Sequence, residues 1–315
     1  MIVDDRIMDA REAIGFRLRG LYSKYGYERY RMSKFEEYDL YSRNRDYLFS
    51  EGVITFTDTN GRLMALKPDV TLSIVKNSKD TPGEVRRLYY HENVYRVSRA
   101  ADGFREKTQV GLECTGDLKE SDIAQVLKLA AESLKLCAED FVLEVSHLGI
   151  LEAFADAISP DPGVKARLLA CAGEKNLHGI SRICAECGLA EGAEKPMRQL
   201  LSLYGTPRTV MPTIRQLAAE NGVGAFATEL GQALTVFTGT EMENRVQIDF
   251  SATGDLKYYN GIAFKGFISG IPGSVLSGGQ YDALMKKMGR RDRAIGFAVF
   301  LDMLERLTEE GDFRA

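Results

Sequence analysis

The sequence predicts an α+β fold in which an antiparallel sheet is flanked by helices and interrupted by a helical insertion. Residues 88–97 and 107–114 are rich in aromatic and β-branched side chains, which favours strands. Residues 151–240 are instead rich in alanine, and prolines divide them into short amphipathic pieces that are typical of helices. We therefore expect a core domain built from residues 1–150 and 241–315, with residues 151–240 inserted into it.

The N-terminal part predicts a helix followed by a hairpin. Apolar residues recur every three or four positions after Asp4 and Asp5, so we expect these aspartates to cap a helix that ends at Tyr25. Residues 53–66 alternate between apolar and polar side chains around Asn60-Gly61, a dipeptide that accepts positive φ in a tight turn. This pattern predicts a hairpin.

The middle of the first half completes the predicted sheet. We expect a polar loop over residues 98–105 to join the two aromatic-rich strands, which form one antiparallel sheet with the hairpin. Apolar spacing then predicts a helix over residues 121–137 and a strand over residues 141–145. After the insertion, strand patterns return at residues 246–251, 258–268 and 294–300. A helix pattern follows at residues 301–310.

Composition limits the classes of partner. The net charge of −4 provides no overall attraction to nucleic acid or to an anionic membrane. Acidic residues at the N-terminus argue against a signal peptide, and no run approaches the about 18 apolar residues of a membrane span, so we expect a cytoplasmic protein. Cys184 and Cys187 have the C-x-x-C spacing with His178 nearby, but no second ligand pair follows; we expect reduced thiols and no metal.

Four tracts of the sequence resemble the histidyl-tRNA synthetase family of class II aminoacyl-tRNA synthetases. They are LKPDVT at 66–71, the motif around Arg96 within 88–116, LKYYNGIAF at 256–264 and SGGQYDAL at 277–284. The resemblance extends over nearly all of the chain, and it implies the class II antiparallel sheet. It leaves out the anticodon-binding domain that would follow residue 315 in that family.

The resemblance also implies a pocket for an amino acid. Asp69 and Thr71 would face its α-ammonium group, with Gln109 beside them, because a carboxylate and two neutral oxygens suit a cation that donates three hydrogen bonds. Arg96 would bind the carboxylate of the amino acid. This set of polar groups is implied by the family pattern and not by spacing alone.

Further residues of the implied pocket favour histidine as the amino acid. Glu113 would accept a hydrogen bond from the imidazole, while Tyr258 and Tyr259 would close over the ring. Gly278 and Gly279 would let a loop pass close to the ligand. Singly, such residues are also typical of solvated carboxylates, strand aromatics and a plain turn; their joint occurrence in the order of the family favours a site.

The departures from the family pattern concern ATP. The family has Arg-x-Glu where this chain has Arg96 followed by Val97 and Ser98, an arginine in place of Gly254, and an aspartate in place of Lys257. Met303 stands where class II enzymes have a nucleotide-binding arginine. Since the loss of one preorganised donor costs about 10² to 10³ in rate, these changes together disfavour adenylation.

A histidine pocket without ATP-binding groups resembles the regulatory subunits of ATP phosphoribosyltransferase. That resemblance implies a non-catalytic protein without a cofactor, which activates a short-form catalytic subunit, forms dimers within a hetero-octamer and conveys feedback inhibition by histidine. Two alternatives stay open. One is a stand-alone enzyme that adenylates histidine for an acceptor other than tRNA, and the other is a synthetase whose anticodon domain lies on a separate chain.

Overall fold

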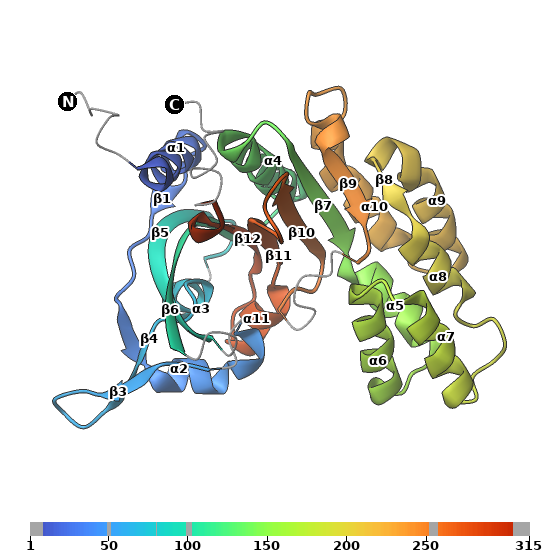
Figure 1. The fold of residues 1–315 in the computed structure, drawn as a ribbon, viewed down its shortest axis with the longest axis horizontal. Helices are drawn as coiled ribbons and strands as arrows, with labels where there is room; N and C mark the ends of the chain where they lie inside the picture. Colours follow the sequence, from blue (N-terminus) through green and yellow to red (C-terminus); the bar gives the residue numbers. More distant parts are fainter. Residues whose placement is uncertain (1–8, 49–51, 80, 99–102, 252–257, 305–315) are drawn as a thin grey trace.

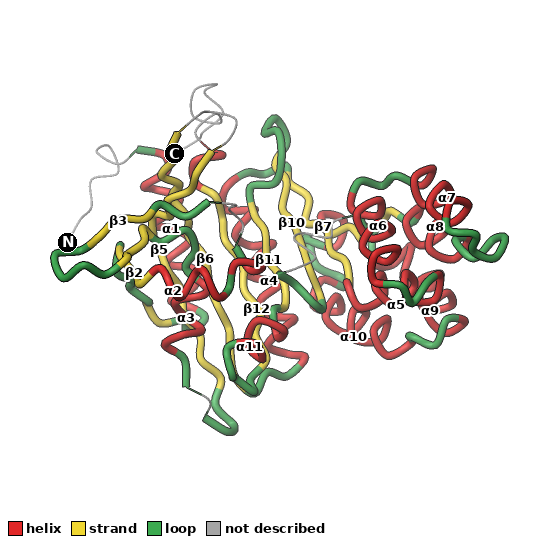
Figure 2. Tube along the Cα trace, turned by 90° about the horizontal axis from the view of Figure 1, so that it is seen from below, coloured by secondary structure: helices red, strands yellow, loops and turns green. Residues whose placement is uncertain are grey.

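The computed structural model describes residues 9–48, 52–79, 81–98, 103–251 and 258–304. In Figure 1 a large sheet forms the body of the molecule, with helices on both faces, and a group of helices lies beside one edge. Figure 2 shows this group at the opposite end of the molecule from a smaller sheet. The chain therefore adopts the expected α+β architecture.

The large sheet is antiparallel at its centre. Nine strands of the described residues form it, in the spatial order β1 (Glu28–Arg29), β5 (Val85–Ser98), β6 (Gly103–Gly116), β12 (Arg293–Phe300), β11 (Leu276–Gln280), β10 (Ile262–Ile268), β7 (Phe141–His147), β9 (Val246–Asp249) and β8 (Tyr204–Gly205). The pairings from β5 to β7 are antiparallel, as expected, whereas β1–β5 and β7–β9 are parallel. Parallel neighbours need a long crossover, which the helices between β7 and β9 supply.

The expected hairpin exists but belongs to a separate sheet. Its strands pair in the order β2 (Phe35–Glu37), β4 (Leu63–Leu66) and β3 (Thr55–Thr57). The expectation that the hairpin shares a sheet with β5 and β6 is therefore wrong. The turn is also longer than expected: Asp58 Oδ1 accepts hydrogen bonds from the N–H groups of Asn60 and Arg62, at 2.8 Å each, and Gly61 alone has positive φ, at 79°.

Two long helices cover one face of the large sheet (Figure 1): α1 (Ala10–Lys24) and α4 (Glu120–Cys137). The end of α1 agrees with the prediction, but its cap does not. Asp9 accepts a hydrogen bond from the Glu12 N–H at 2.8 Å, and the Glu12 carboxylate accepts one from the Asp9 N–H at 3.1 Å. This reciprocal pair is a capping box, so Asp9 begins the helix, and Asp4 and Asp5 lie outside the described residues.

Three short helices lie against the opposite face: α2 (Tyr38–Arg43), α3 (Thr71–Asn77) and α11 (Asp282–Lys287). Tyr41, Leu72 and Leu284 are fully buried there and form a second apolar cluster together with Tyr258 and Tyr259. This face therefore contains several of the residues that the sequence suggested for a pocket.

The segment after β7 is helical, as predicted. It contains α5 (Leu148–Ile158), α6 (Pro162–Gly173), α7 (Leu177–Glu186), α8 (Lys195–Ser202), α9 (Pro207–Glu220) and α10 (Gly224–Leu234). Prolines stand in the first turn of α6, α8 and α9, where a missing N–H costs nothing. Pro212, however, lies inside α9 and does not separate two helices.

Three further boundaries differ from the prediction. The loop expected over residues 98–105 is shorter, because β5 extends to Ser98 and β6 begins at Gly103. The strand expected over residues 258–268 begins only at Ile262, and a 3₁₀ helix spans Leu301–Leu304 where the final helix was expected; residues 305–310 lie outside the described residues. Among the helices of the described residues, none combines the length and apolar character that crossing a bilayer requires.

A partly buried polar cluster connects α10 to the large sheet. Glu229 on α10 accepts hydrogen bonds from Arg293 at 3.0 Å and from Gln280 at 3.2 Å, and its other oxygen lies 3.4 Å from His147 Nε2. The hydrogen bond with His147, with help from Gln280 and Arg293, lowers the pKa of Glu229 to about 2. The ionised carboxylate is thus the form that holds the helix against β7, β11 and β12.

Replacing Glu229 with glutamine is expected to lower the free energy of unfolding at pH 7 by about 1–2 kcal/mol, after allowance for solvent screening. Because the folded-state pKa lies below the unfolded value, this contribution is complete above about pH 5 and disappears as the pH falls toward 2. Urea unfolding at pH 7 and pH 3 measures the difference, with exposed Glu191→Gln as the control. An equal deficit at both pH values would contradict an electrostatic role.

Candidate functional site

Small residues on neighbouring strands create a cavity over the large sheet. In the register of β6, β12 and β11, Ala298 lies between Gly111 and Ser277, and Gly296 lies beside Gly279. These residues alternate along their strands and therefore share one face. Because their side chains are small or absent, they leave room above the sheet for other groups.

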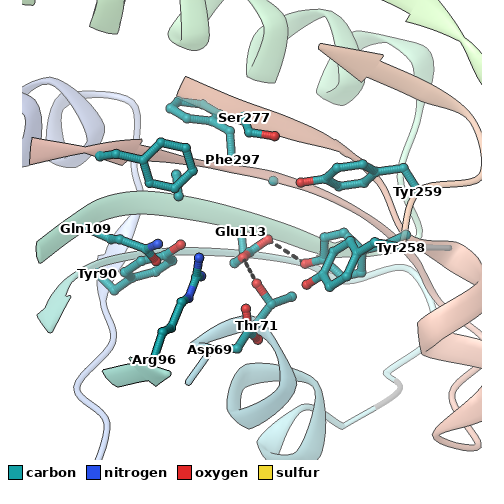
Figure 3. Close-up of a pocket in the computed structure, with 14 residues that line it drawn as sticks. Asp69, Thr71, Tyr90, Arg96, Gln109, Glu113, Tyr258, Tyr259, Ser277 and Phe297 are labelled. Atoms are coloured by element: carbon teal, nitrogen blue, oxygen red, sulfur yellow. Dashed lines mark hydrogen bonds between the residues drawn. The ribbon is translucent and has the colours of Figure 1, made fainter. Parts of the chain in front are cut away.

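All seven side chains that the sequence assigned to a ligand line this cavity (Figure 3): Asp69, Thr71, Arg96, Gln109, Glu113, Tyr258 and Tyr259. The space between the lining atoms, counted out to the open mouth, is about 390 Å³. The cavity therefore brings all of the assigned polar and aromatic groups together around one open space.

Glu113 is the most constrained charged group in the cavity. Its side chain is buried on β6, where Oε1 accepts a hydrogen bond from the Thr71 hydroxyl and Oε2 accepts one from the Tyr281 hydroxyl, both at 2.6 Å. Burial raises the pKa of Glu113 to about 8, against the opposing effect of these two donors, and the nearby charge of Asp69 raises it further. A ligand that donates a hydrogen bond to this carboxyl group would favour its ionised form.

Asp69 and Arg96 supply the other charges. Asp69 precedes α3, and its Oδ1 accepts a hydrogen bond from the Leu72 N–H at 2.9 Å, which fixes the carboxylate at the start of the helix. Burial raises the pKa of Asp69, while the Leu72 N–H and the positive charge of Arg96 oppose that rise. Arg96 donates from Nε to the carbonyl of Pro68 at 3.3 Å, so its terminal nitrogens point into the cavity (Figure 3).

Aromatic side chains close the other side of the cavity. The rings of Tyr258 and Tyr259 meet edge to face, with centroids 4.9 Å apart, and Tyr281 lies 6.0 Å from Tyr258. Burial raises the pKa of Tyr258 and Tyr281 well above the ordinary value, so both phenols stay protonated. The wall is therefore apolar in its rings and polar at its hydroxyl groups, of which that of Tyr281 already donates to Glu113.

The glycine pair does not form the expected loop. Gly278 and Gly279 lie within β11, and neither lines the cavity. A Cβ at Gly278 would lie 2.4 Å from the Cβ of Phe297, and a Cβ at Gly279 would lie 2.8 Å from the ring of Tyr259. These glycines thus allow neighbouring groups to pack, and Gly279 sets how closely Tyr259 approaches the sheet.

Several lining residues were missed by the sequence analysis. Tyr90, Ser277, Tyr281 and Gly296 border the cavity beside the expected residues. Ser277 and Tyr281 lie within the fourth tract that matched the family, so that tract contained the signal for them. Tyr90 likewise lies within the second tract, at 88–116, whereas Gly296 follows from the strand register, in which it pairs with Glu113.

The groups around the cavity match a zwitterion with an additional polar ring. Two carboxyl groups suit donors such as ammonium or imidazole N–H, and the guanidinium of Arg96 suits a carboxylate. No group of three or more His, Cys, Asp or Glu side chains is placed to bind a metal within the residues that the structure describes. Cys184 and Cys187, at the end of α7, are free thiols; the first is buried and the second is exposed.

The positions that depart from the synthetase pattern are only partly described. Ser98 is the last residue of β5, and Met303 packs against the main apolar core from the 3₁₀ helix. Gly254 and Lys257 lie outside the described residues. Among the described residues that line the cavity, Arg96 is the sole cationic side chain, so the cavity offers one guanidinium where adenylation requires several positive groups.

Comparison with known proteins places the chain in a family. Residues 3–304 match the family model described as histidyl-tRNA synthetase. An ATP phosphoribosyltransferase regulatory subunit from Oceanobacillus iheyensis is 26% identical over 91% of this chain and 71% of its own length, and one from Alkaliphilus metalliredigens is 27% identical over 96% and 77%. A crystal structure titled as an ATP phosphoribosyltransferase regulatory subunit/histidyl-tRNA synthetase from Bacillus halodurans aligns with a TM-score of 0.82 and 25% identity, over 93% of this chain and 78% of that one. The chain therefore belongs to the histidyl-tRNA synthetase family.

Proposed function

We propose that this chain is the non-catalytic regulatory subunit of ATP phosphoribosyltransferase, which acts in the first step of histidine biosynthesis, and that its cavity binds histidine as the feedback inhibitor. The observation that carries the proposal is the convergence of Asp69, Arg96 and Glu113 on one cavity. The names of the curated relatives support the regulatory role. On this proposal the chain has no cofactor and acts in the cytoplasm.

Histidine fits the polar groups in one orientation. Its ammonium group meets Asp69, Thr71 and Gln109, and its carboxylate meets Arg96. Thr71 already donates its hydroxyl proton to Glu113, but the oxygen keeps lone pairs that accept from the ammonium.

The side chain of histidine then faces Glu113. The imidazole N–H donates to this carboxyl group, and Tyr258 and Tyr259 enclose the ring. Both ring nitrogens need partners when buried, so a site with a carboxylate and phenols discriminates for histidine over apolar amino acids of similar size.

The alternative is a stand-alone enzyme that adenylates histidine. It requires a second and third positive group for the triphosphate, and the lining residues of the described chain offer Arg96 alone. A synthetase that recruits its anticodon domain from another chain has the same requirement. Regulation is therefore the better supported function.

The regulatory proposal specifies an assembly and a source of inhibition. The chain forms dimers, which combine with short-form catalytic subunits into a hetero-octamer of four and four, and the catalytic subunit depends on this partner for activity. Histidine inhibits because it binds one quaternary arrangement more tightly than another. By linkage, its binding shifts the assembly toward that arrangement.

ATP phosphoribosyltransferase activity of the short-form catalytic subunit from the same organism, measured with and without this chain across a histidine titration, tests the function. We expect activity that depends on the chain and falls as histidine rises. Activity that ignores the chain would refute the proposal. Pyrophosphate exchange with histidine and ATP is the companion assay, and clear turnover in it would favour the adenylating alternative.

A further inference from the structure

A second, open groove lies in the helical segment, remote from the cavity over the sheet. It runs along α9 and is bordered on its other side by the end of α10 and residues 235–243. The space between its walls, counted to the open mouth, is about 1,080 Å³, which exceeds that of the histidine cavity. Its size and open shape suit a chain segment better than a small metabolite.

The floor of the groove is apolar. Met211 on α9, Leu234 at the end of α10 and Phe237 line it, and each is less than a tenth exposed. These side chains belong to the main apolar core, so the floor is a rigid part of the fold. An apolar side chain of a ligand would therefore find a preformed contact surface.

Two arginines of α9 border the groove, and the guanidinium of Arg215 reaches toward α10, where its Nη2 lies 2.9 Å from the place of a Cβ at Gly231. Arg208 and Arg215 are exposed on α9, seven residues apart, which places them on one side of the helix about 10 Å apart along its axis. Within the described part of the chain, neither guanidinium has a hydrogen-bond or ion-pair partner. The groove also contains one carboxylate, Glu243, which accepts a hydrogen bond from the Gly239 N–H at 2.8 Å.

The absence of intramolecular partners distinguishes this pair from neighbouring arginines. The others with polar contacts in and next to the helical segment are Arg167 with Glu186, Arg182 with Glu186, Arg198 with Ser181 and Arg245 with Asp140. In a chain with a net charge of −4, these two cations outnumber Glu243, the one carboxylate among the described residues that line the groove, and so form a local positive rim. Such a rim suits carboxylates supplied by another molecule.

The backbone of α9 offers a further contact. Pro212 lines the groove and has no N–H, so the carbonyl of Arg208 lacks the donor that a helix normally supplies four residues later. Acceptors of this kind are satisfied by water, by side chains or by an N–H group from a ligand. Peptides carry N–H donors along their backbone, whereas phosphate groups and fatty acids at neutral pH do not.

We propose that this groove binds an acidic segment of the catalytic subunit, with two carboxylates on Arg208 and Arg215 and an apolar side chain between them on the floor. The inference rests on the proposed function and adds the surface through which the partner binds. A separation of about 10 Å corresponds to about three residues of an extended chain, so the segment has the pattern acidic, two intervening residues, acidic.

The double variant Arg208→Glu/Arg215→Glu tests the surface. Its matched control is Arg17→Glu/Lys24→Glu, which makes the same charge change at two exposed positions seven residues apart on α1 that do not line the groove. Calorimetry with the purified catalytic subunit measures the dissociation constant of the complex at low and at high salt. We expect the groove variant to bind at least about tenfold more weakly at low salt, with a smaller difference at high salt, while the control binds like wild type.

Two further readouts keep the outcomes separate. Histidine binding measured on each variant alone is expected to be unchanged, which establishes that the fold is intact. Wild-type affinity of Arg208→Glu/Arg215→Glu for the catalytic subunit overturns the groove and leaves the proposed function standing. Failure of the wild-type chain itself to bind the catalytic subunit overturns both the groove proposal and the proposed function. If the groove variant instead loses binding to an RNA duplex probe, the groove belongs to nucleic acid, and the proposal of an acidic peptide segment is overturned.

Discussion

Replacing Glu113 with glutamine is expected to weaken histidine binding by about 100-fold, because a buried charged acceptor contributes on the order of 3 kcal/mol to a hydrogen bond with the ligand. Glutamine keeps the shape of the side chain but loses the charge, and its amide nitrogen repels an imidazole N–H. Calorimetric titration with histidine measures the change. Activation of the catalytic subunit should survive in this variant while histidine inhibition is lost.

The control for this prediction is Glu144→Gln, a carboxylate on β7 that does not line the cavity. It should leave histidine binding unchanged. Undiminished inhibition in Glu113→Gln would place the histidine sensor elsewhere on the chain. Loss of both activation and inhibition would show instead that Glu113 maintains the complex.

The pKa of Glu113 adds a dependence on pH. Because burial raises this pKa to about 8, the ionised form destabilises the folded protein, and the destabilisation grows as pH rises from about 4.5 through 8. Without ligand, Glu113→Gln should therefore equal wild type in stability at pH 4 and exceed it by about 5 kcal/mol at pH 9. Histidine binding near pH 7 should release protons, which calorimetry in buffers of different ionisation enthalpy detects; absence of release would mean that Glu113 is already ionised.

The sequence predicted those parts of the fold that depend on neighbouring residues. The strands within 88–97 and 107–114 and the helix ending at Cys137 follow from local apolar periodicity, and the structure contains all three. The pairing of β2 with β4 was not predictable in this way. It joins Phe35 to Leu66 across 30 intervening residues. In addition, β2 has only three residues, which is too short for a clear alternation of apolar and polar side chains.

The site was predictable through family resemblance for the residues that carry polar groups. What the resemblance could not supply was the space between them. Gly278 and Gly279 together suggest a turn because paired glycines often occur in loops, yet here they lie side by side within a strand. Their role depends on contacts with Phe297 and Tyr259, which only the strand register and the packing of the cluster reveal.

Replacing Gly296 with alanine is expected to lower the free energy of unfolding by about 3 kcal/mol and to abolish histidine binding. An added Cβ would lie 1.8 Å from Oε2 of Glu113 and 2.6 Å from the backbone oxygen of Leu112. The side chain of Glu113 would have to leave its bonds to Thr71 and Tyr281, and the backbone of β6 would have to shift. Urea unfolding and histidine titration measure the two effects.

Gly20→Ala is the matched control. Gly20 is exposed within α1, and no heavy atom lies within 4 Å of its added Cβ, so alanine there should stabilise the protein by about 0.5–1 kcal/mol. Opposite signs for the same chemical change would show that the packing around each glycine, and not the loss of glycine itself, determines the result. Wild-type histidine affinity in Gly296→Ala would mean that Glu113 does not need its present position.

The double variant Gly296→Ala/Glu113→Ala separates the two clashes. If the contact with the Glu113 carboxylate dominates, removing that side chain relieves most of the strain, and the double variant is more stable than the sum of the single changes predicts. If the backbone oxygen of Leu112 dominates, the two changes add. Strong coupling is the expected result because the Glu113 contact is the shorter by 0.8 Å, the difference between 2.6 Å and 1.8 Å. In that case Gly296 exists to make room for Glu113, and a residue without a side chain determines whether the pocket can hold its central acceptor.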